Sequence, residues 1–267
     1  MPVISAIMSV YNNENTVEEA MNSILGQTFQ DWECIICDDA SDDGTWHKIN
    51  GIARGNARFI VMRNDKNRGP AFTRNRCIEK ARGRYIVIQD ADDISAPDRF
   101  DVLSGVLEGN EQIGAAGSYA RLVDKDGGTW GKLTAATNPE TGAWLSGCQV
   151  IHASVMFRKK DLLESGLYDE TLRTAEDYDL FSRLIVRGLK VVSVPRFLYS
   201  VRWDASSYRR KNLAARWQEA RVKLRIARMT AAKWYSYLYV VKPLVLGFIP
   251  PVLLYAYHRR VFSKSNR

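Results

Sequence analysis

Four short apolar runs rich in β-branched residues constrain the fold of this chain more than any other feature of its sequence. The runs lie at residues 4–10, 34–37, 59–62 and 85–88. Each is too short for a globular helix and is typical of a buried strand. Between them, apolar residues recur at helical spacing over 17–25, and a basic helical pattern lies between Gly69 and Gly83. This alternation predicts an α/β fold with helices on both faces of a sheet.

A polar loop follows each of the four runs. The loops comprise residues 11–13, 38–44, 64–69 and 90–93. Sheets of this kind bind their ligands beyond the carboxyl ends of the strands. Because all four loops fall at such ends, the sequence predicts that they form a single site.

The fourth loop carries Asp90, Asp92 and Asp93 directly behind its apolar run. Three carboxylates in four positions repel one another unless a cation or a polar ligand lies among them. Carboxylate oxygens are the ligands that Mg²⁺ and similar cations prefer. The loop therefore predicts a divalent metal site that supports phosphate chemistry. A solvated helix-capping loop before Pro97 is the structural alternative.

Further elements are expected in the second half of the chain. Residues 113–123 and 152–157 have strand-like patterns. Thr174 and Asp177 precede an apolar helical pattern, and their spacing fits helix capping. Capping is therefore a structural explanation for these two residues.

The charge of the chain divides between its body and its C-terminal part. Residues 1–201 carry a formal charge of −5 and residues 202–267 carry +13, which gives the total of +8. A basic, helix-compatible segment is followed by an apolar and aromatic stretch over 234–257 that a lysine and several prolines interrupt. A membrane span needs about 20 apolar residues in one clean run. We therefore expect an interfacial or re-entrant element at a lipid surface, with packing on the body or on a second subunit as the alternative.

The N-terminus and the cysteines point to a reducing compartment. The first residues lack the basic region and cleavage site of a signal peptide, so the body is expected in the cytosol. Cys34 and Cys37 are three positions apart in a strand-like run, where their side chains would face opposite sides. Core packing is therefore expected in place of a disulfide or a metal site.

In their order along the chain, the loop residues resemble those of glycosyltransferase family 2, whose members have the GT-A fold and invert the transferred sugar. Six motifs in the family's order and spacing make the resemblance specific. The matching residues are 10–12, 23–29, 38–45, 67–69 with 74–75, 90–93 and 175–177. The resemblance implies a Rossmann-like mixed sheet flanked by helices in a catalytic domain over 1–203. It does not cover residues 204–267, which we expect to be a basic and apolar helical tail.

The resemblance also implies how the donor is bound. Tyr11 and Asp39 would contact the nucleotide base, with Asp39 accepting a hydrogen bond from a uracil or thymine imide. Gly69 and Arg74 would contact the donor sugar or phosphate, and Asp90 would approach the ribose or the sugar. The structural alternatives are a turn with a helix cap for the Asp39 loop, a cover of the sheet edge for Tyr11 and a solvated helix charge for Arg74.

The resemblance assigns the metal and the base to different parts of the chain. Asp92 would bind Mn²⁺ or Mg²⁺ bridging the donor diphosphate, and Asp93 is an alternative ligand that the sequence leaves open. Asp177 would be the general base that takes the proton of the attacking hydroxyl. His152 would assist the metal or the pyrophosphate, although a structural role is the commoner fate of a histidine.

These assignments predict metal-dependent transfer of a sugar from a UDP or dTDP donor to a hydroxyl of a lipid-linked glycan, in polysaccharide or cell-surface glycan synthesis. The expected partners are the nucleotide sugar, the glycan acceptor and the inner face of the cell membrane, which the tail would contact. No nucleic-acid partner is expected, and oligomerisation is left open.

Two other classes of function compete with this interpretation. A nucleotidyltransferase that makes nucleotide sugars shares the α/β layout and the acidic metal site, but its Gly-rich basic phosphate loop is not visible near the N-terminus. A non-enzymatic protein that binds a membrane surface or a nucleic acid would use the basic tail, and its affinity would depend strongly on salt.

Overall fold

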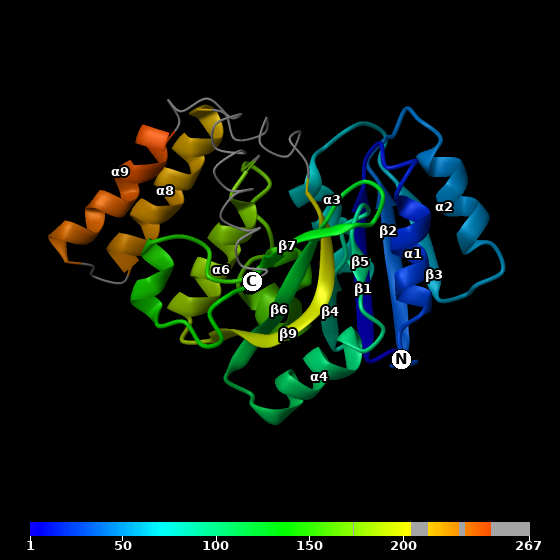
Figure 1. Cartoon of the computed structure of the whole chain (residues 1–267), viewed down its shortest axis with the longest axis horizontal. Helices are drawn as coiled ribbons and strands as arrows, with labels where there is room; N and C mark the ends of the chain where they lie inside the picture. The colour runs from blue at the N-terminus through cyan, green and yellow to red at the C-terminus, as the bar shows by residue number, and fades with distance from the viewer. Residues whose placement is uncertain (173, 204–212, 230–232, 247–267) are drawn as a thin grey trace.

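The computed structural model describes residues 1–172, 174–203, 213–229 and 233–246. The alternation expected in the first half of the chain is confirmed. Four parallel strands pair in the order β3-β2-β1-β4. They are β1 (Ile4–Val10), β2 (Trp32–Asp38), β3 (Phe59–Arg63) and β4 (Tyr85–Ile88), connected by α1 (Val17–Leu25), α2 (Thr45–Ala53) and α3 (Pro70–Lys80). Their carboxyl ends therefore meet at one edge of the sheet (Figure 1).

The sheet continues beyond β4 with mixed strand directions. The path runs from β4 through β8 (Met156–Arg158), β6 (Ile113–Val123) and β9 (Lys190–Arg202) to β5 (Ile94–Ser95), and β7 (Thr129–Leu133) pairs with β6. β8 is antiparallel to both β4 and β6, whereas β6 and β9 are parallel. The result is the mixed, helix-flanked sheet that the resemblance implied.

Residues 152–157 do not form one strand as the sequence pattern predicted. His152–Ser154 is a short 3-10 helix, and β8 begins only at Met156. The Ser154 hydroxyl explains the difference, because it accepts from the Ser118 amide and donates to the Ser118 carbonyl, both at 3.0 Å. A side chain thus satisfies the β6 backbone groups in place of strand pairing.

Buried side chains alternate between the two faces of the sheet. In β2, Ile35 and Cys37 belong to one apolar cluster, and Cys34 and Ile36 belong to the other. Both cysteines are free thiols. The expectation of core packing for this C-x-x-C pair is confirmed.

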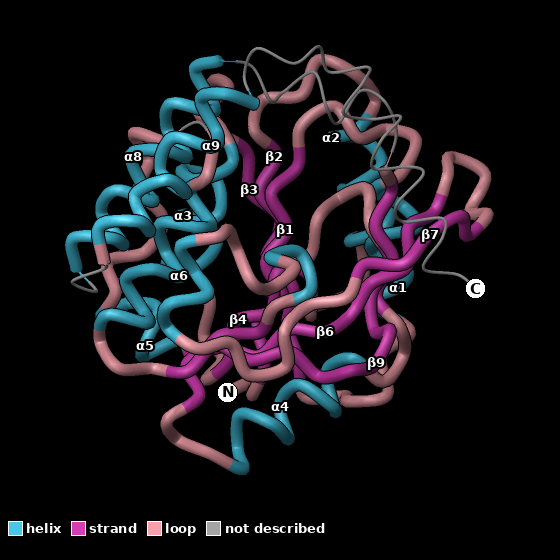
Figure 2. The backbone as a smooth tube through the Cα atoms, turned by 60° about the vertical axis from the view of Figure 1, so that its left-hand side comes forward, coloured by secondary structure: helices cyan, strands magenta, loops and turns pink. Residues whose placement is uncertain are grey.

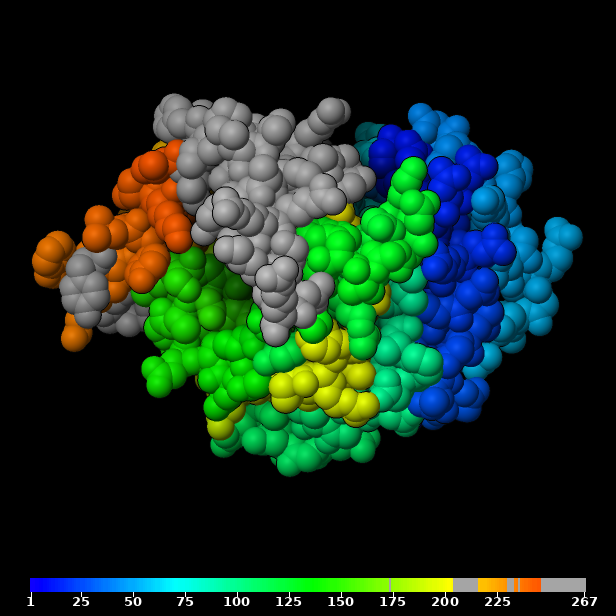
Figure 3. All heavy atoms as spheres, viewed as in Figure 1, coloured from blue at the N-terminus to red at the C-terminus, as the bar shows by residue number. Residues whose placement is uncertain are grey.

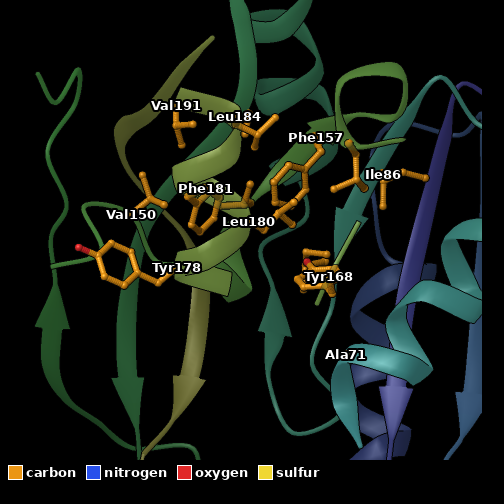
Figure 4. Close-up of a cluster of buried hydrophobic side chains, with 14 of the residues drawn as sticks. Ala71, Ile86, Val150, Phe157, Tyr168, Tyr178, Leu180, Phe181, Leu184 and Val191 are labelled. Atoms are coloured by element: carbon orange, nitrogen blue, oxygen red, sulfur yellow. The ribbon is translucent and has the colours of Figure 1, made fainter. Parts of the chain in front are cut away.

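Helices cover both faces. The remaining ones are α4 (Arg99–Gly109), α5 (Lys159–Glu164), α6 (Glu176–Val186), α8 (Leu213–Met229) and α9 (Leu238–Leu246), with 3-10 turns η1 (Thr141–Leu145) and η3 (Trp234–Tyr237). Figure 4 shows the cluster beneath α6, where the ring of Phe157 stacks on that of Phe181 at 5.7 Å between centroids.

The basic C-terminal part begins with a helix that packs on the body. Val222, Ile226 and Ala227 of α8 are buried in the same cluster as Phe181. In Figure 2, α8 and α9 lie on the same side of the sheet as α3 and α6. Within the described residues no helix has the length and apolar character needed to cross a bilayer. Residues 247–257 of the apolar stretch lie outside the described ranges, and the division of the chain at residue 203 stays a prediction.

Candidate functional site

A cavity of about 1100 Å³ opens at the carboxyl ends of β1, β2 and β4. A volume of this order accommodates a substrate-sized ligand. The wall brings together the site residues expected from the sequence, namely Tyr11, Asp39, Gly69, Arg74, Asp90, Asp92, Asp93 and Asp177. The polar loops thus meet in one place, as predicted.

Asp39 organises the loop before α3. Its carboxylate accepts hydrogen bonds from the amides of Arg68 and Gly69, both at 2.8 Å, and from Asn64 Nδ2 at 2.6 Å. Gly69 has φ +88°, a left-handed conformation that favours glycine. The loop therefore presents Gly69 and Pro70, the first residue of α3, to the cavity in a fixed geometry.

Arg74 joins the end of β4 to the start of α6. Its guanidinium is 3.1 Å from Asp90 Oδ1 and 3.0 Å from Glu176 Oε1. Burial alone would lower the pKa of Arg74, but these two carboxylates raise it above its ordinary value. Burial likewise opposes ionisation of Asp90, yet Arg74 holds the pKa of that carboxyl below its usual range. Arg74 is thus a buried, charged link between two walls of the cavity.

Asp92 and Asp93 occupy different environments. Asp93 is 3% exposed and accepts from the Arg202 amide at 2.9 Å and from the Tyr199 hydroxyl. Burial, with the charges of Asp92 and Asp90, raises the pKa of Asp93 well above its ordinary value. Asp92 is half-buried on the cavity wall. Asp93 is thus bound to β9, and Asp92 lies on the wall of the cavity.

The donor set on this wall fits a hard divalent cation only in part. Among the described residues, no three His, Cys, Asp or Glu side chains are grouped so that they could hold a metal ion by themselves. Mg²⁺ is commonly bound through one or two carboxylates and completed by substrate phosphates and water. A single wall carboxylate such as that of Asp92 is compatible with this mode.

Asp177 lies in the first turn of α6, far along the sequence from Asp39 and from the aspartates of residues 90–93. Burial raises the pKa of its carboxyl to about 6, and the charge of Glu176 adds to the effect. Asp177 Oδ1 accepts from the amide of Tyr178 at 2.7 Å. A carboxyl with this pKa is ionised at neutral pH and still accepts a proton readily, which suits a general base.

The expected capping role of Thr174 and Asp177 is wrong. Ala175 is the N-cap of α6, in a left-handed conformation with φ +61°, and no side chain caps the helix. Thr174 instead donates to Gln218 Oε1 of α8, from its amide at 3.0 Å and its hydroxyl at 2.8 Å. The Thr174 hydroxyl therefore binds a distant helix and not the first turn of α6.

His152 lies behind the cavity and is not among its lining residues. Its Nε2 is 2.8 Å from the Tyr168 hydroxyl, and its ring contacts those of Tyr168 and Phe181 edge-on. Burial, together with the charge of Arg74, lowers the pKa of His152 to about 3, so the ring is neutral at pH 7. These contacts are those of a structural histidine.

Several residues of the wall were missed by the sequence analysis. β9 contributes Arg202 and its neighbour Trp203, and α8 contributes Arg216 and Glu219. Arg216 Nη1 is 3.2 Å from Glu219 Oε2. In the sequence, Arg216 is one of many basic residues in a long run, so no local signal distinguishes it.

Strained backbone also gathers at the cavity. Asn12 (φ +53°) and Ala175 (φ +61°) line it, and Ala40 (φ +62°) directly follows Asp39. Left-handed conformations cost a non-glycine residue roughly 1–2 kcal/mol. Such strain persists where the surrounding structure over-determines it, commonly at functional sites.

Comparison with known proteins finds a family model and several relatives that match this chain. Residues 5–165 match the family model described as Glycosyl transferase family 2. EpsE of Bacillus subtilis (strain 168), a protein named as a glycosyltransferase, is 31% identical over 262 residues, which cover 97% of this chain and 94% of EpsE. The similarity to EpsE therefore extends beyond the matched domain into the C-terminal part.

A second relative has a more specific name. It is the UDP-Glc:α-D-GlcNAc-diphosphoundecaprenol β-1,3-glucosyltransferase WfaP of Escherichia coli, 28% identical over 71% of this chain and 73% of WfaP. Among solved structures, the mannosyltransferase PcManGT of Pyrobaculum calidifontis, in complex with GDP-Man and Mn²⁺, superposes with a TM-score of 0.65 at 16% identity. The superposition covers 99% of this chain and 84% of PcManGT, and it supports the same GT-A fold.

Proposed function

Since this chain belongs to glycosyltransferase family 2, we propose that it transfers a sugar from a UDP or dTDP donor to a hydroxyl of a glycan acceptor, with inversion at the anomeric carbon. The observation that carries the proposal is the shared cavity of Asp92, at the end of β4, and Asp177, at the start of α6. In a single displacement the attacking hydroxyl and the leaving diphosphate lie on opposite faces of the sugar. Asp92 would serve the diphosphate and Asp177 the hydroxyl, and their positions on separate elements suit this arrangement.

We assign the metal role to Asp92. A bound Mn²⁺ or Mg²⁺ would offset the charge that develops on the departing diphosphate. Two observations favour this assignment: Asp92 lies on the cavity wall, and the GT-A neighbour PcManGT is a complex with Mn²⁺. The Asp93 carboxylate accepts from the Arg202 amide and the Tyr199 hydroxyl of β9 and so holds the acidic loop in place; Asp93 would act through position and not as the main ligand.

On the donor side, Tyr11 and Asp39 would contact the base, and Gly69 would approach the phosphates at the N-terminus of α3. Asp39 retains room for one further donor beside its three hydrogen bonds, because a carboxylate has about four acceptor positions. Arg74 would act mainly by holding Asp90 in its ionised form next to the sugar. These roles are assigned from the family resemblance and are compatible with the contacts described above.

We propose further that the acceptor is a lipid-linked glycan and that the enzyme works in polysaccharide or cell-surface glycan synthesis at the inner face of the cell membrane. The name of WfaP, which specifies a diphosphoundecaprenol-linked acceptor, supports this proposal. Residues 1–203 would form the catalytic domain and residues 204–267 the membrane-associating part. Membership of a glycosyltransferase family disfavours the nucleotidyltransferase and the non-enzymatic binding protein.

A panel of nucleotide sugars tests the proposal. We expect UDP or dTDP sugars to raise the melting temperature of the protein in the presence of Mn²⁺, and Asp92→Ala to remove both the stabilisation and the transfer of sugar to a polyprenyl diphosphate-linked acceptor. Asp98→Ala, which removes an exposed carboxylate outside the cavity, is the matched control and should keep both the stabilisation and the sugar transfer. Metal-independent donor binding in the Asp92→Ala protein would contradict the assignment.

A further inference from the structure

The outward side of the C-terminal helical pair is unusually apolar. η3 and α9 expose six large apolar side chains within twelve consecutive residues. They are Trp234 (83% exposed), Tyr237 (38%), Leu238 (71%), Tyr239 (42%), Val241 (52%) and Val245 (60%). Single exposed apolar residues are normal on a protein, but a contiguous set marks an interaction site.

Packing on the body does not account for these side chains. α9 is apolar on nearly all sides, and its inward side is already covered, with Val240 against the main cluster and Pro243 buried. Figure 1 places α9 at one end of the molecule, beyond α8, and Figure 3 shows its surface at the same edge. The six exposed residues, which we call the apolar face, lie on the outward side of the described helical pair.

The pair of packed helices that carries the apolar face also exposes basic residues. Arg221 and Arg228 are exposed on one side of α8, seven residues apart, and Lys242 is exposed on α9. The sole acidic residue in the sequence of 213–246 is Glu219, which lines the cavity. The exterior of this helical pair therefore combines apolar and cationic groups with no carboxylate, which is complementary to an anionic lipid surface.

We propose that the apolar face lies in the headgroup region of an anionic bilayer, with Arg221, Arg228 and Lys242 beside lipid phosphates. Within the described residues α9 has nine residues, fewer than the roughly 20 that a span needs, so we place the pair in the plane of the membrane surface. The functional role of this membrane contact rests on the proposed function, because a lipid-linked acceptor would be bound at the same surface.

The position of α8 connects this surface with the cavity. One side of α8 contributes Arg216 and Glu219 to the cavity wall, and Gln218 binds Thr174 next to the proposed base. Arg221 and Arg228 lie on the exposed side of the same helix. An acceptor anchored in the bilayer would therefore approach the cavity along a helix that is itself seated on the membrane.

Vesicle flotation of the full chain tests the proposal. We expect binding to vesicles of phosphatidylglycerol and phosphatidylethanolamine, and weaker binding to phosphatidylcholine alone or at high salt. Trp234→Ser with Leu238→Ser should weaken binding roughly tenfold or more, because interfacial affinity scales with the apolar area inserted. Arg221→Gln with Arg228→Gln should weaken binding to the anionic vesicles and reduce its salt dependence.

The matched control is Leu163→Ser with Val186→Ser, which removes two exposed apolar side chains (47% and 45% exposed) from α5 and α6. This control should bind vesicles like the wild type, and all variants should keep the thermal stabilisation by donor, which reports an intact fold. Equal flotation of the Trp234/Leu238 variant and the wild type would overturn the proposal, and so would absence of binding by the wild type.

Size-exclusion chromatography with light scattering tests whether a second copy of the chain, and not a lipid surface, covers the apolar face. If the Trp234/Leu238 variant converts a dimer to a monomer while vesicle binding is unchanged, a second copy covers the apolar face and the lipid assignment is wrong. Vesicle binding does not depend on transfer, so a protein that floats with lipid but transfers no sugar refutes the proposed function and leaves the lipid contact standing.

Discussion

The chemistry proposed for this site depends on one carboxyl group, that of Asp177. Asp177→Asn keeps the size of the side chain but removes its basicity. We expect transfer to fall by about 10²–10⁴-fold, the usual contribution of a general base, while metal-dependent donor binding is retained. Steady-state transfer assays and donor titrations by calorimetry measure the two effects. Near-normal turnover of the variant would show that another group accepts the proton.

The same residue sets the expected pH dependence. Because the pKa of Asp177 is raised to about 6, the basic form is present above that pH and is lost as the pH falls through it. We expect kcat/KM to decline about tenfold per pH unit below the midpoint. Glu176→Gln removes a neighbouring negative charge and should move the midpoint to lower pH. A profile that is flat through pH 6, with donor binding also unchanged, would contradict the assignment of the base.

The sequence contained a signal for some residues of the site and none for others. Asp92 and Asp177 stand in short motifs whose order along the chain is informative. Arg216 and Glu219 reach the cavity because α8 packs against α6, a contact that depends on the tertiary arrangement of apolar residues such as Val222. No local pattern in the basic run separates a wall residue from a solvated one.

α8 supports the segment just before α6, the helix whose first turn carries Asp177. Gln218→Ala would remove the acceptor that holds both the amide and the hydroxyl of Thr174. We expect kcat to fall about tenfold, because small displacements of a catalytic group are costly, while donor affinity stays near the wild-type value. Gln112→Ala, at an exposed position outside the cavity, is the control. A fall in donor affinity with kcat unchanged would indicate that Gln218 serves the donor instead.

The packing of α8 also predicts an effect on stability. Ile226 is 3% exposed and belongs to the main apolar cluster. Ile226→Ala should lower the free energy of unfolding by about 2–4 kcal/mol, through lost burial and the cavity left behind. Urea unfolding monitored by fluorescence measures the change, with Arg228→Ala as the exposed control. A change within about 0.5 kcal/mol would mean that α8 docks only loosely.

The elements that the sequence predicted best are those whose burial leaves a periodic signal. Strands β1, β2 and β4 are buried on both faces, and these three and the edge strand β3 contain continuous apolar runs. The segment at His152–Ser154 also has a strand-like composition, but the Ser154 hydroxyl replaces strand pairing with its own hydrogen bonds to Ser118. Such side-chain contacts depend on where β6 lies and are not visible in the segment itself.

Across the whole molecule, the charge pattern and the fold have different origins. The α/β sheet follows from the alternation of strands and helices in the acidic body, and the GT-A fold that the family resemblance implied there was predicted correctly. The basic C-terminal part was expected to be separate from the catalytic machinery, and its domain boundary stays a prediction. α8 nevertheless belongs to this part by charge and to the body by packing, since it contributes both to the apolar cluster and to the cavity wall.

The left-handed alanines at the cavity have a consequence for anyone who engineers this protein. Ala40 and Ala175 hold conformations that glycine adopts without strain. A search for heat-resistant variants would therefore be drawn to glycine at these two positions. Yet both lie close to residues on which donor recognition and proton transfer are proposed to depend. A more flexible backbone there would make the orientations of the Asp39 and Asp177 carboxylates less well defined. Selection for thermostability and selection for turnover should diverge at these two sites first.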